Sequence, residues 1–325
     1  MNIKKNLIKI ENLKKYFPVK KGFFSKTRDY VKAVDDITLD IEATKTLGLV
    51  GESGSGKTTL GKTLIRLLNP SEGRIVFDNI DITHLSSRDL RPIRRDMQII
   101  FQNPYGSLNP RMNVESIISE GIAVHNTVSK NERKDYVLKL LNEVGLNKDV
   151  IGRYPHEFSG GQRQRIAIAR AIALKPKFIV CDEPVSALDV SVQAQIINLL
   201  QQLQETYGLT YLFIAHDLRA VKHISDKVAV MYLGKVVEIA NSEEIYLNPL
   251  HPYTKILISA IPDINKKKID LVENNFNSLE IPSPINVPSG CSFHPRCPIA
   301  TEICRQVVPM MEEKTEEHKA ACHNV

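Results

Sequence analysis

In Gly51-Glu52-Ser53-Gly54-Ser55-Gly56-Lys57-Thr58, which we call the phosphate loop, the glycines allow backbone N–H groups to turn inward around an anion. Lys57 can extend from this loop toward the terminal phosphates of a nucleotide. A short apolar run at residues 46–50 precedes the loop, and a helical pattern over residues 57–68 follows it. Strand, glycine loop and helix in this order form the context that phosphate binding requires. The segment therefore predicts a nucleotide site in an α/β protein.

The remainder of the chain alternates apolar strand patterns with helical ones, which predicts an α/β fold with a largely parallel sheet. Residues from about 88 to 165 are helix-rich and charged, and they separate the first strand from apolar runs at 178–181 and 210–215. We interpret them as an inserted helical subdomain. Beyond residue 261 the chain is rich in Pro, Asn and Lys, which predicts a loop-dominated tail. We expect a nucleotide-binding domain over residues 1–260 and a C-terminal region over 261–325.

The composition is that of an ordinary globular protein, with 325 residues, 42% of them apolar. The formal charge of +6 arises from 43 basic and 37 acidic residues spread along the chain, so we expect no nucleic-acid partner. No apolar run approaches the roughly 18 residues of a membrane span, and the first residues do not resemble a signal peptide. We therefore predict a cytoplasmic chain that reaches a membrane only through partners. In such a reducing compartment, its five cysteines favour ligand or core roles over disulfides.

Two adjacent carboxylates follow the apolar run at residues 178–181. They lie at the carboxyl end of a predicted strand, where ligands bind in open α/β sheets. We predict that Asp182 and the hydroxyl of Thr58 hold Mg²⁺, and that Glu183 polarises the attacking water as a general base. Such a base contributes about 10² to 10⁴ in rate. The sequence thus predicts a nucleotide hydrolase.

A second glycine-rich helix start occurs in Phe158-Ser159-Gly160-Gly161-Gln162-Arg163-Gln164-Arg165, which we call the signature segment. Its N–H groups at a helix N-terminus again suit an anion. The segment resembles the signature motif of ABC transporter ATPases, with Phe158 where that family more often has Leu. The resemblance implies a P-loop NTPase core of the RecA-like ABC type. It also implies that Ser159, Gly160, Gly161 and Gln162 cap the ATP of a partner subunit in a head-to-tail dimer.

The same resemblance assigns further residues. Gln102 is similar to the Q-loop glutamine, which contacts Mg²⁺ and the water. Asp189, in Ser186-Ala187-Leu188-Asp189, is similar to the D-loop aspartate, and His216 to the switch histidine at the γ-phosphate. The adenine-stacking aromatic is predicted to be Tyr16, with Phe17 and Tyr30 as alternatives. The remaining predicted nucleotide-binding residues are Gly51, Glu52, Ser53, Gly54, Ser55, Gly56, Lys57, Thr58 and Thr59.

Three longer stretches resemble the ATPases of oligopeptide and dipeptide importers, and most closely their F-type subunit. They span residues 101–111, 153–158 and 248–254. The resemblance implies a heterodimer with a D-type sister ATPase, two transmembrane permease subunits and, indirectly, an extracytoplasmic peptide-binding protein. It places the chain peripherally on the cytoplasmic face of the membrane. Alternatives are a nickel or metal-chelate importer ATPase of the same family and a soluble ABC ATPase acting on nucleic acid. The residues do not specify the transported substrate.

Four cysteines lie close together near the C-terminus, namely Cys291, Cys297, Cys304 and Cys322. Their spacing resembles the C-terminal motif of the same importer subfamily, in which four thiolates hold a 4Fe-4S cluster. Four thiolates can equally hold tetrahedral Zn²⁺, so zinc remains the alternative. Either centre would brace a tail with too few apolar residues to fold alone. Cys181 ends an apolar run and is predicted to be a core residue.

Overall fold

The computed structural model describes residues 5–19, 29–261 and 282–325. The chain forms two compact units, each built from several chain segments. Unit 1 comprises Met1–Leu7, Ile41–Thr46 and His84–Ala215, and unit 2 comprises Ile8–Asp40, Leu47–Thr83 and His216–Val325. None of the helices in the described ranges has the length and hydrophobicity that a membrane crossing needs.

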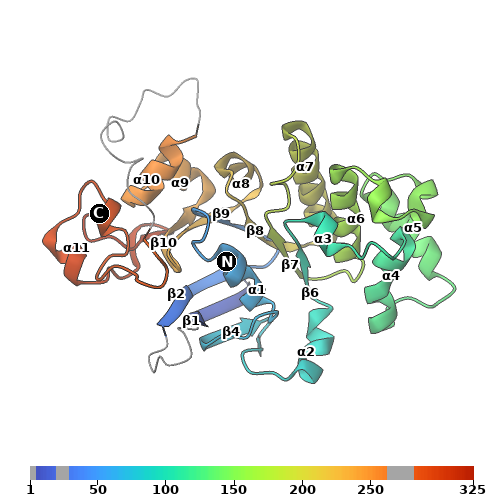
Figure 1. Ribbon diagram of the computed structural model, residues 1–325, viewed down its shortest axis with the longest axis horizontal. Coiled ribbons are helices and arrows are strands. Elements are labelled where there is room, and N and C mark those ends of the chain that lie inside the picture. Colours follow the sequence, from blue (N-terminus) through green and yellow to red (C-terminus); the bar gives the residue numbers. More distant parts are fainter. Residues whose placement is uncertain (1–4, 20–28, 262–281) are drawn as a thin grey trace. The chain divides into compact units, whose positions relative to one another are not determined.

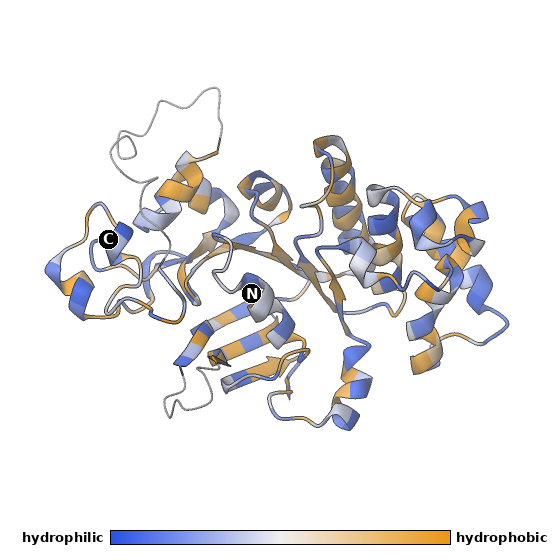
Figure 2. Cartoon of the chain, in the orientation of Figure 1, coloured by the Kyte–Doolittle hydropathy of each residue, from blue (hydrophilic) through white to orange (hydrophobic). Residues whose placement is uncertain are grey.

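Unit 1 is built around three parallel strands, β6 (Met97–Ile100), β7 (Phe178–Asp182) and β8 (Thr210–Ile214). Cys181 pairs with Ile100 on one side and with Phe213 on the other. All residues of β7 and β8 are buried, as expected for parallel strands covered on both faces. Figure 2 shows these strands in hydrophobic colours. Cys181 is fully buried, which confirms its predicted core position.

Unit 1 also contains helices on both sides of β7 in the sequence (Figure 1). They are α2 (Ser87–Arg94), α3 (Pro104–Ser107), α4 (Val114–His125), α5 (Arg133–Glu143), α6 (Gly160–Ile172) and α7 (Val190–Tyr207), with 3-10 turns at Lys148–Gly152 and Pro155–Glu157. The region 88–165 is not helical throughout, because β6 lies within it and pairs with β7. The four residues of β6 are too short an apolar run to be separated from a helical pattern by periodicity alone.

Unit 2 contains two sheet regions. In the first, β3 (Thr46–Val50) pairs in parallel with β9 (Lys227–Tyr232), and β9 forms an antiparallel hairpin with β10 (Lys235–Asn241). The second is a four-stranded sheet in the order β2-β1-β4-β5, formed by Asp29–Glu42, Asn6–Val19, Glu72–Phe77 and Ile80–Asp81. In β2, exposed and buried residues alternate, as expected for a sheet with one face on a core.

The helices of unit 2 are short. They are α1 (Lys57–Leu64), α8 (Leu218–Ile224), α9 (Ser242–Leu247), α10 (Pro252–Ser259) and α11 (Glu302–Gln306), with a 3-10 turn at His294–Arg296. Helix α1 is shorter than the predicted 57–68, because Arg66 adopts a left-handed backbone with φ of 54°. The guanidinium of Arg66 then donates to the carbonyls of Ile82 and Thr83 at 2.8 and 2.5 Å. Tertiary hydrogen bonding therefore ends the helix earlier than its sequence pattern suggests.

The described C-terminal residues 282–325, which we call the tail, are more regular than predicted. The tail adds β12 (His318–Ala320) to the edge of β10, and β11 (Glu312–Thr315) to β12. Beneath this edge the fully buried carboxylate of Glu238 lies 2.7 Å from His318 Nε2 and accepts the backbone N–H groups of Leu250 and His251 at 2.8 Å each. A buried carboxylate needs such partners. The tail is therefore anchored to the rest of unit 2 by strand pairing and buried polar contacts.

Candidate active site

The phosphate loop joins β3 to α1 in unit 2, as predicted. Gly56 has φ of 106°, and a Cβ there would lie 1.9 Å from the carbonyl oxygen of Ala33, so only glycine fits this position. Lys57 is buried, with 5% exposure, and its Nζ donates to the carbonyls of Gly51 at 2.7 Å and Glu52 at 2.9 Å. The lysine charge is thus held against the loop at the N-terminus of α1, where the helix dipole also favours an anion.

Thr58 and Thr59 occupy the first turn of α1 and are partly exposed. Ser55 is buried, whereas Ser53 and Gly54 are exposed at the tip of the loop. A Cβ on Gly54 would meet no heavy atom within 4 Å. The loop therefore has a supported base and an open tip, as a loop that encloses a ligand requires.

The carboxylates at the end of β7 differ in environment. Asp182 is buried, with 3% exposure, whereas Glu183 is partly exposed and has a left-handed φ of 48°. The Glu183 N–H donates to the carbonyl of Ile214 at 2.9 Å, which holds this unfavourable backbone in place. The Asp182 side chain is therefore in a buried environment and the Glu183 side chain is in a partly exposed one, which suits different roles.

Gln102, predicted separately, lies directly beside Glu183. Its Nε2 donates to Glu183 Oε2 at 2.6 Å, although 81 residues separate the two in the chain. An amide donor fixes the orientation of a carboxylate, and a carboxylate oriented in this way can act as a base toward water. Both residues belong to unit 1, so this part of the predicted hydrolytic apparatus is assembled within one compact unit.

The signature segment forms the N-terminus of α6. Ser159 Oγ accepts from the N–H of Gln162 at 3.3 Å, and Gln162 Oε1 accepts from the N–H of Ser159 at 3.0 Å. This is a capping box, and both side chains are exposed. Phe158 is buried. The helix tip is therefore held by its own side chains and exposed at the surface.

The signature glycines pack against the segment that contains the predicted D-loop. A Cβ on Gly161 would lie 2.7 Å from Val192, and one on Gly160 would lie 3.3 Å from Leu188. Asp189 is exposed and precedes α7 as its N-cap. The structure thus brings the signature and the D-loop together. His216 is exposed between β8 and α8.

The candidate adenine-stacking aromatics differ in exposure. Tyr16 is half-buried, and its hydroxyl donates to the carboxylate of Asp35. Burial, followed by this contact with Asp35, raises the pKa of Tyr16 above its usual value. Phe17 is also half-buried, while Tyr30 is 42% exposed. Part of the segment between them, residues 20–28, lies outside the described residues.

The four tail cysteines are free thiols within the tail. Burial is the main cause that raises the pKa of Cys297 to about 11, and it also raises the pKa values of Cys291 and Cys322. Asn324 joins two of them, since its backbone N–H lies 3.5 Å from Cys322 Sγ and its Nδ2 lies 3.7 Å from Cys304 Sγ. In the described part of the chain, no three or more His, Cys, Asp or Glu side chains form a group that could hold a metal ion.

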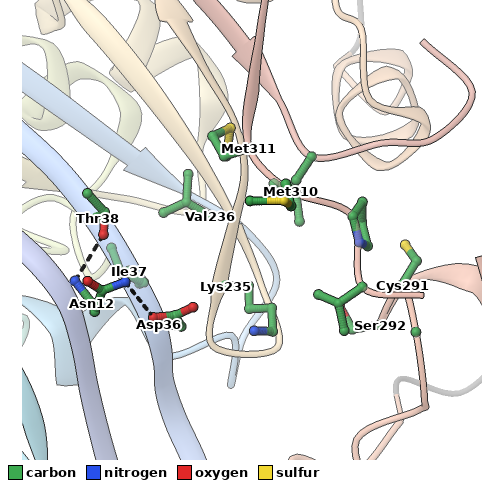
Figure 3. A pocket seen from close by; sticks show the side chains of 15 residues that line it. Asn12, Asp36, Ile37, Thr38, Lys235, Val236, Cys291, Ser292, Met310 and Met311 are labelled. Carbon is green, nitrogen blue, oxygen red and sulfur yellow. Dashed lines mark hydrogen bonds between the residues drawn. The ribbon is translucent and has the colours of Figure 1, made fainter. Parts of the chain in front are cut away.

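A cavity of about 410 Å³ lies in unit 2 beside the tail (Figure 3). Asp36 and Thr38 of β2 lie on one side of it, and Cys291 and Ser292 of the tail on the other. Met310 and Met311 also line it. Of the four tail cysteines only Cys291 lies in its wall, so the cavity is not where the four thiols meet.

The sequence did not reveal two side chains that hold the phosphate loop. The guanidinium of Arg296 binds the carboxylate of Glu52 through two hydrogen bonds, at 2.7 and 2.9 Å. The hydroxyl of Tyr253 accepts the backbone N–H of Glu52 at 2.8 Å. Arg296 is 244 residues from Glu52, and no local pattern could have linked them.

Comparison with known proteins extends this description. Residues 34–186 match the family described as ABC transporter, and residues 237–304 match the family described as oligopeptide/dipeptide transporter, C-terminal region. The oligopeptide transport ATP-binding protein AppF of Bacillus subtilis is 51% identical over 98% of this chain and 97% of its own length. The oligopeptide transport ATP-binding protein OppF of Salmonella typhimurium is 49% identical over 99% of this chain and 97% of its own.

Solved structures give the same fold. The dimeric ATP-binding cassette MJ0796, in a post-hydrolysis state bound to ADP and Pi, matches with a TM-score of 0.65 and 29% identity, over 72% of this chain and 98% of its own. The cbiO1 protein from Clostridium perfringens, part of the ABC transporter complex cbiONQ, matches with a TM-score of 0.64 and 29% identity, over 75% of this chain and 91% of its own. The fold and the site together define an ABC-type ATPase cassette.

Within that class, the chain belongs to the family of ATP-binding proteins of oligopeptide and dipeptide ABC transporters. It is an ATPase that energises peptide import. The predicted α/β ABC fold and the predicted activity are confirmed. The relatives named here are peptide transport proteins, so they do not favour the metal-chelate or nucleic-acid alternatives.

Proposed function

We propose that this chain hydrolyses Mg-ATP at a site shared with a D-type sister ATPase. The contact between Gln102 and Glu183 carries the hydrolytic part of the proposal, because it orients a carboxylate at the carboxyl end of β7. In this mechanism Glu183 accepts a proton from water, the water oxygen attacks the γ-phosphorus, and the bond to the β-phosphate oxygen breaks to leave ADP and phosphate. His216 donates a hydrogen bond to the γ-phosphate.

The other site residues bind and orient the nucleotide. Lys57 and the N–H groups of the phosphate loop hold the β- and γ-phosphates, and Tyr16 stacks on adenine. Thr58, Asp182 and Gln102 would hold Mg²⁺, and their oxygen atoms are the ligand type that this ion prefers. When bound, Mg²⁺ neutralises the charge that develops on the phosphate oxygens. The position of Asp182 supports this assignment, because it ends β7 at the carboxyl edge of the parallel strands, where ligands bind in open α/β sheets.

The signature segment acts on the nucleotide of the sister subunit. Its exposed helix tip offers N–H groups at a surface where a second ATPase can dock, and Asp189 lies in the adjoining segment. We further propose that residues 1–260 form the nucleotide-binding domain and 261–325 the C-terminal region. The inserted helical subdomain, at about 88–165, transmits closure of the dimer to two permease subunits at the cytoplasmic face of the membrane. An extracytoplasmic peptide-binding protein delivers the substrate.

The four tail cysteines are proposed to hold a 4Fe-4S cluster, with Zn²⁺ as the alternative. Their donor set suits either centre, and the contacts of Asn324 with Cys304 and Cys322 place two thiols near each other. Because the four thiols do not form a metal-holding group as described, they must converge when the centre binds. The centre would brace the tail and takes no part in hydrolysis.

Replacement of the base tests the hydrolytic mechanism. Glu183→Gln in the assembled complex should retain ATP binding and lose about 10² to 10⁴ in turnover. Glu205→Gln, at an exposed position on α7, is the matched control and should leave turnover unchanged. Near wild-type hydrolysis by the Glu183 variant would remove Glu183 as the base. Loss of ATP binding together with turnover would indicate a structural role instead.

Metal analysis tests the cluster. The full-length chain, purified without oxygen, should contain iron and acid-labile sulfide and absorb visible light, and Cys297→Ser should lose this absorbance. Cys181→Ser, which changes the buried cysteine of β7, is the control and should keep it. A colourless wild-type protein that contains one zinc per chain would establish the alternative. A chain with neither metal would contradict both.

A further inference from the structure

The tail and the phosphate loop are joined by a contact that the proposed chemistry does not use. Arg296 lies between Cys291 and Cys297, and its Nη1 and Nη2 donate to Glu52 Oε2 and Oε1 at 2.7 and 2.9 Å. The side chains of Arg296 and Glu52 are 7% and 25% exposed. A two-point ion pair with one largely buried partner fixes orientation as well as distance. The second residue of the phosphate loop is therefore held by the C-terminal region.

The arginine end of this contact is itself held firmly. The Arg296 guanidinium lies 5.9 Å from the ring centre of Tyr232 and 6.0 Å from that of Phe293, which is within cation-π range. Phe293 is fully buried, with its ring centre 5.2 Å from that of Tyr232 and 5.4 Å from that of Tyr253. Because aromatic packing fixes both Phe293 and the guanidinium, Arg296 presents a preformed fork to Glu52.

The glutamate end connects directly to the phosphate-binding groups. The Glu52 N–H donates to Tyr253 Oη at 2.8 Å, while its carbonyl accepts from Lys57 Nζ at 2.9 Å and from the N–H of Ser55 at 3.2 Å. The side chain, the N–H and the carbonyl of one residue are thus all engaged. If the side chain is released, the peptide that orients Lys57 loses one of its three restraints.

We propose that Arg296 is a positioning residue of the nucleotide site, which holds Glu52 so that the tail sets the affinity of the phosphate loop for Mg-ATP. The physical basis is preorganisation, because a loop already fixed in its binding conformation loses less entropy when the ligand arrives. Arg296 also neutralises a carboxylate that would otherwise repel the phosphates. Linkage requires the reverse effect, so that bound Mg-ATP stabilises the tail. This inference rests on the proposed ATP binding at the phosphate loop.

Calorimetric titration of the full-length chain with Mg-ATP tests the proposal. Arg296→Gln should weaken binding about 10-fold, the scale of one charge-assisted hydrogen-bonded contact. Arg305→Gln replaces an exposed arginine of the same tail and is the control, with wild-type affinity expected. An Arg296→Gln variant that is folded and binds like wild type would overturn the inference. A wild-type chain that does not bind Mg-ATP would instead overturn the proposed function, and the inference with it.

A double-mutant cycle separates positioning from charge neutralisation. Glu52→Gln removes the carboxylate without altering the tail, so it also covers the case in which Arg296→Gln fails to fold. Positioning predicts that Glu52→Gln weakens binding several-fold, and that the double variant binds no worse than Arg296→Gln alone. If Glu52→Gln binds as well as wild type, Arg296 acts by neutralisation only and the positioning role is wrong.

Hydrogen exchange provides a readout that a purely structural role would not change. In the wild-type chain, Mg-ATP should slow exchange in the peptide that covers residues 291–297, because the ligand stabilises the joined tail. In Arg296→Gln this protection should disappear, while protection of the phosphate loop at saturating Mg-ATP remains. Equal tail protection in both proteins would show that the coupling does not pass through Arg296.

Discussion

Two helices in the described residues, α1 and α6, begin at glycine-rich segments, and they are built differently. Helix α1 follows the phosphate loop, where Gly56 needs a left-handed backbone and Lys57 is buried. Helix α6 begins at the signature segment, where Gly160 and Gly161 lie within the helix and are small because Leu188 and Val192 pack against them. One segment requires glycine for its backbone, and the other for close packing. Similar sequence patterns therefore arise from different physical needs.

The two helix starts also differ in what supports them. The phosphate loop is held from outside, by Arg296 and Tyr253. The tip of α6 has its own capping box, in which Ser159 and Gln162 bond to each other's backbone, and its glycines pack against Leu188 and Val192. We infer that the first binds its ligand within this chain, whereas the second is arranged to receive one from another chain. This difference can be tested by matched substitutions at the two sites.

The largest effect is expected at the lysine of the phosphate loop. Lys57→Ala should reduce hydrolysis by the assembled complex about 10³-fold, because it removes the charge that we propose contacts the terminal phosphates. The isolated chain should also lose Mg-ATP binding. Titration of the isolated chain checks this, with Lys62→Ala on the partly exposed face of α1 as the control. Unchanged affinity in the Lys57 variant would mean that the phosphate loop does not bind the nucleotide.

The next largest effect is expected on stability, when the glycine of each helix start is replaced by alanine. Gly56→Ala should destabilise the chain by about 3 kcal/mol, because its Cβ would overlap a backbone oxygen and its φ is unfavourable for alanine. Gly160→Ala should cost less than about 1 kcal/mol, since its nearest neighbour is the end of a leucine side chain at 3.3 Å. Urea unfolding of both variants measures the difference. Equal losses would contradict the distinction between backbone and packing glycines.

Acid should lower the stability of the chain through His251. This residue accepts the N–H of Tyr253, whose hydroxyl holds the phosphate loop at Glu52. Burial, followed by the charge of Lys255, lowers the pKa of His251 to about 3. The unfolded chain, with a histidine pKa near 6.5, therefore binds more protons, and stability falls as the pH drops below about 6.5 toward 3. At pH 5 this amounts to about 2 kcal/mol.

His251→Asn isolates this effect, because asparagine can also accept the N–H of Tyr253 that His251 Nδ1 accepts at 3.1 Å. Between pH 7 and pH 5 the variant should lose about 2 kcal/mol less stability than wild type. Urea unfolding at the two pH values measures it. If the variant and wild type lose the same stability, His251 does not contribute to acid sensitivity.

The smallest effect is expected at the signature segment, and only in the assembled complex. Ser159→Asp keeps a good N-cap but places a negative charge where a partner's phosphate would lie. It should leave Mg-ATP binding by the isolated chain unchanged and slow hydrolysis by the complex about 10-fold. Ser159→Asn keeps the cap without the charge and should be much less affected. If both variants hydrolyse ATP at the same rate, the helix tip does not face a phosphate.

The sequence by itself determined the nucleotide loop, the strand that leads to Asp182 and Glu183, and the signature helix. These features depend on residues that are neighbours in the chain, where glycine, charge and apolar periodicity act over one turn or one strand. The sequence could not predict β6, because its four residues are too few to show a period, and it could not predict the two strands of the tail. Strands of this kind are defined by their pairing partners, and those lie far away in the chain.

Only the tertiary structure decided which distant side chains meet. Gln102 and Glu183 are 81 residues apart, and Arg296 and Glu52 are 244 apart. Gln102, Glu183 and Glu52 were each predicted from a motif and Arg296 was not, but both contacts follow from strand order and from the packing of the tail. Hydrogen bonds and ion pairs act over a few ångströms, so the fold must bring the partners together before their chemistry can be assigned.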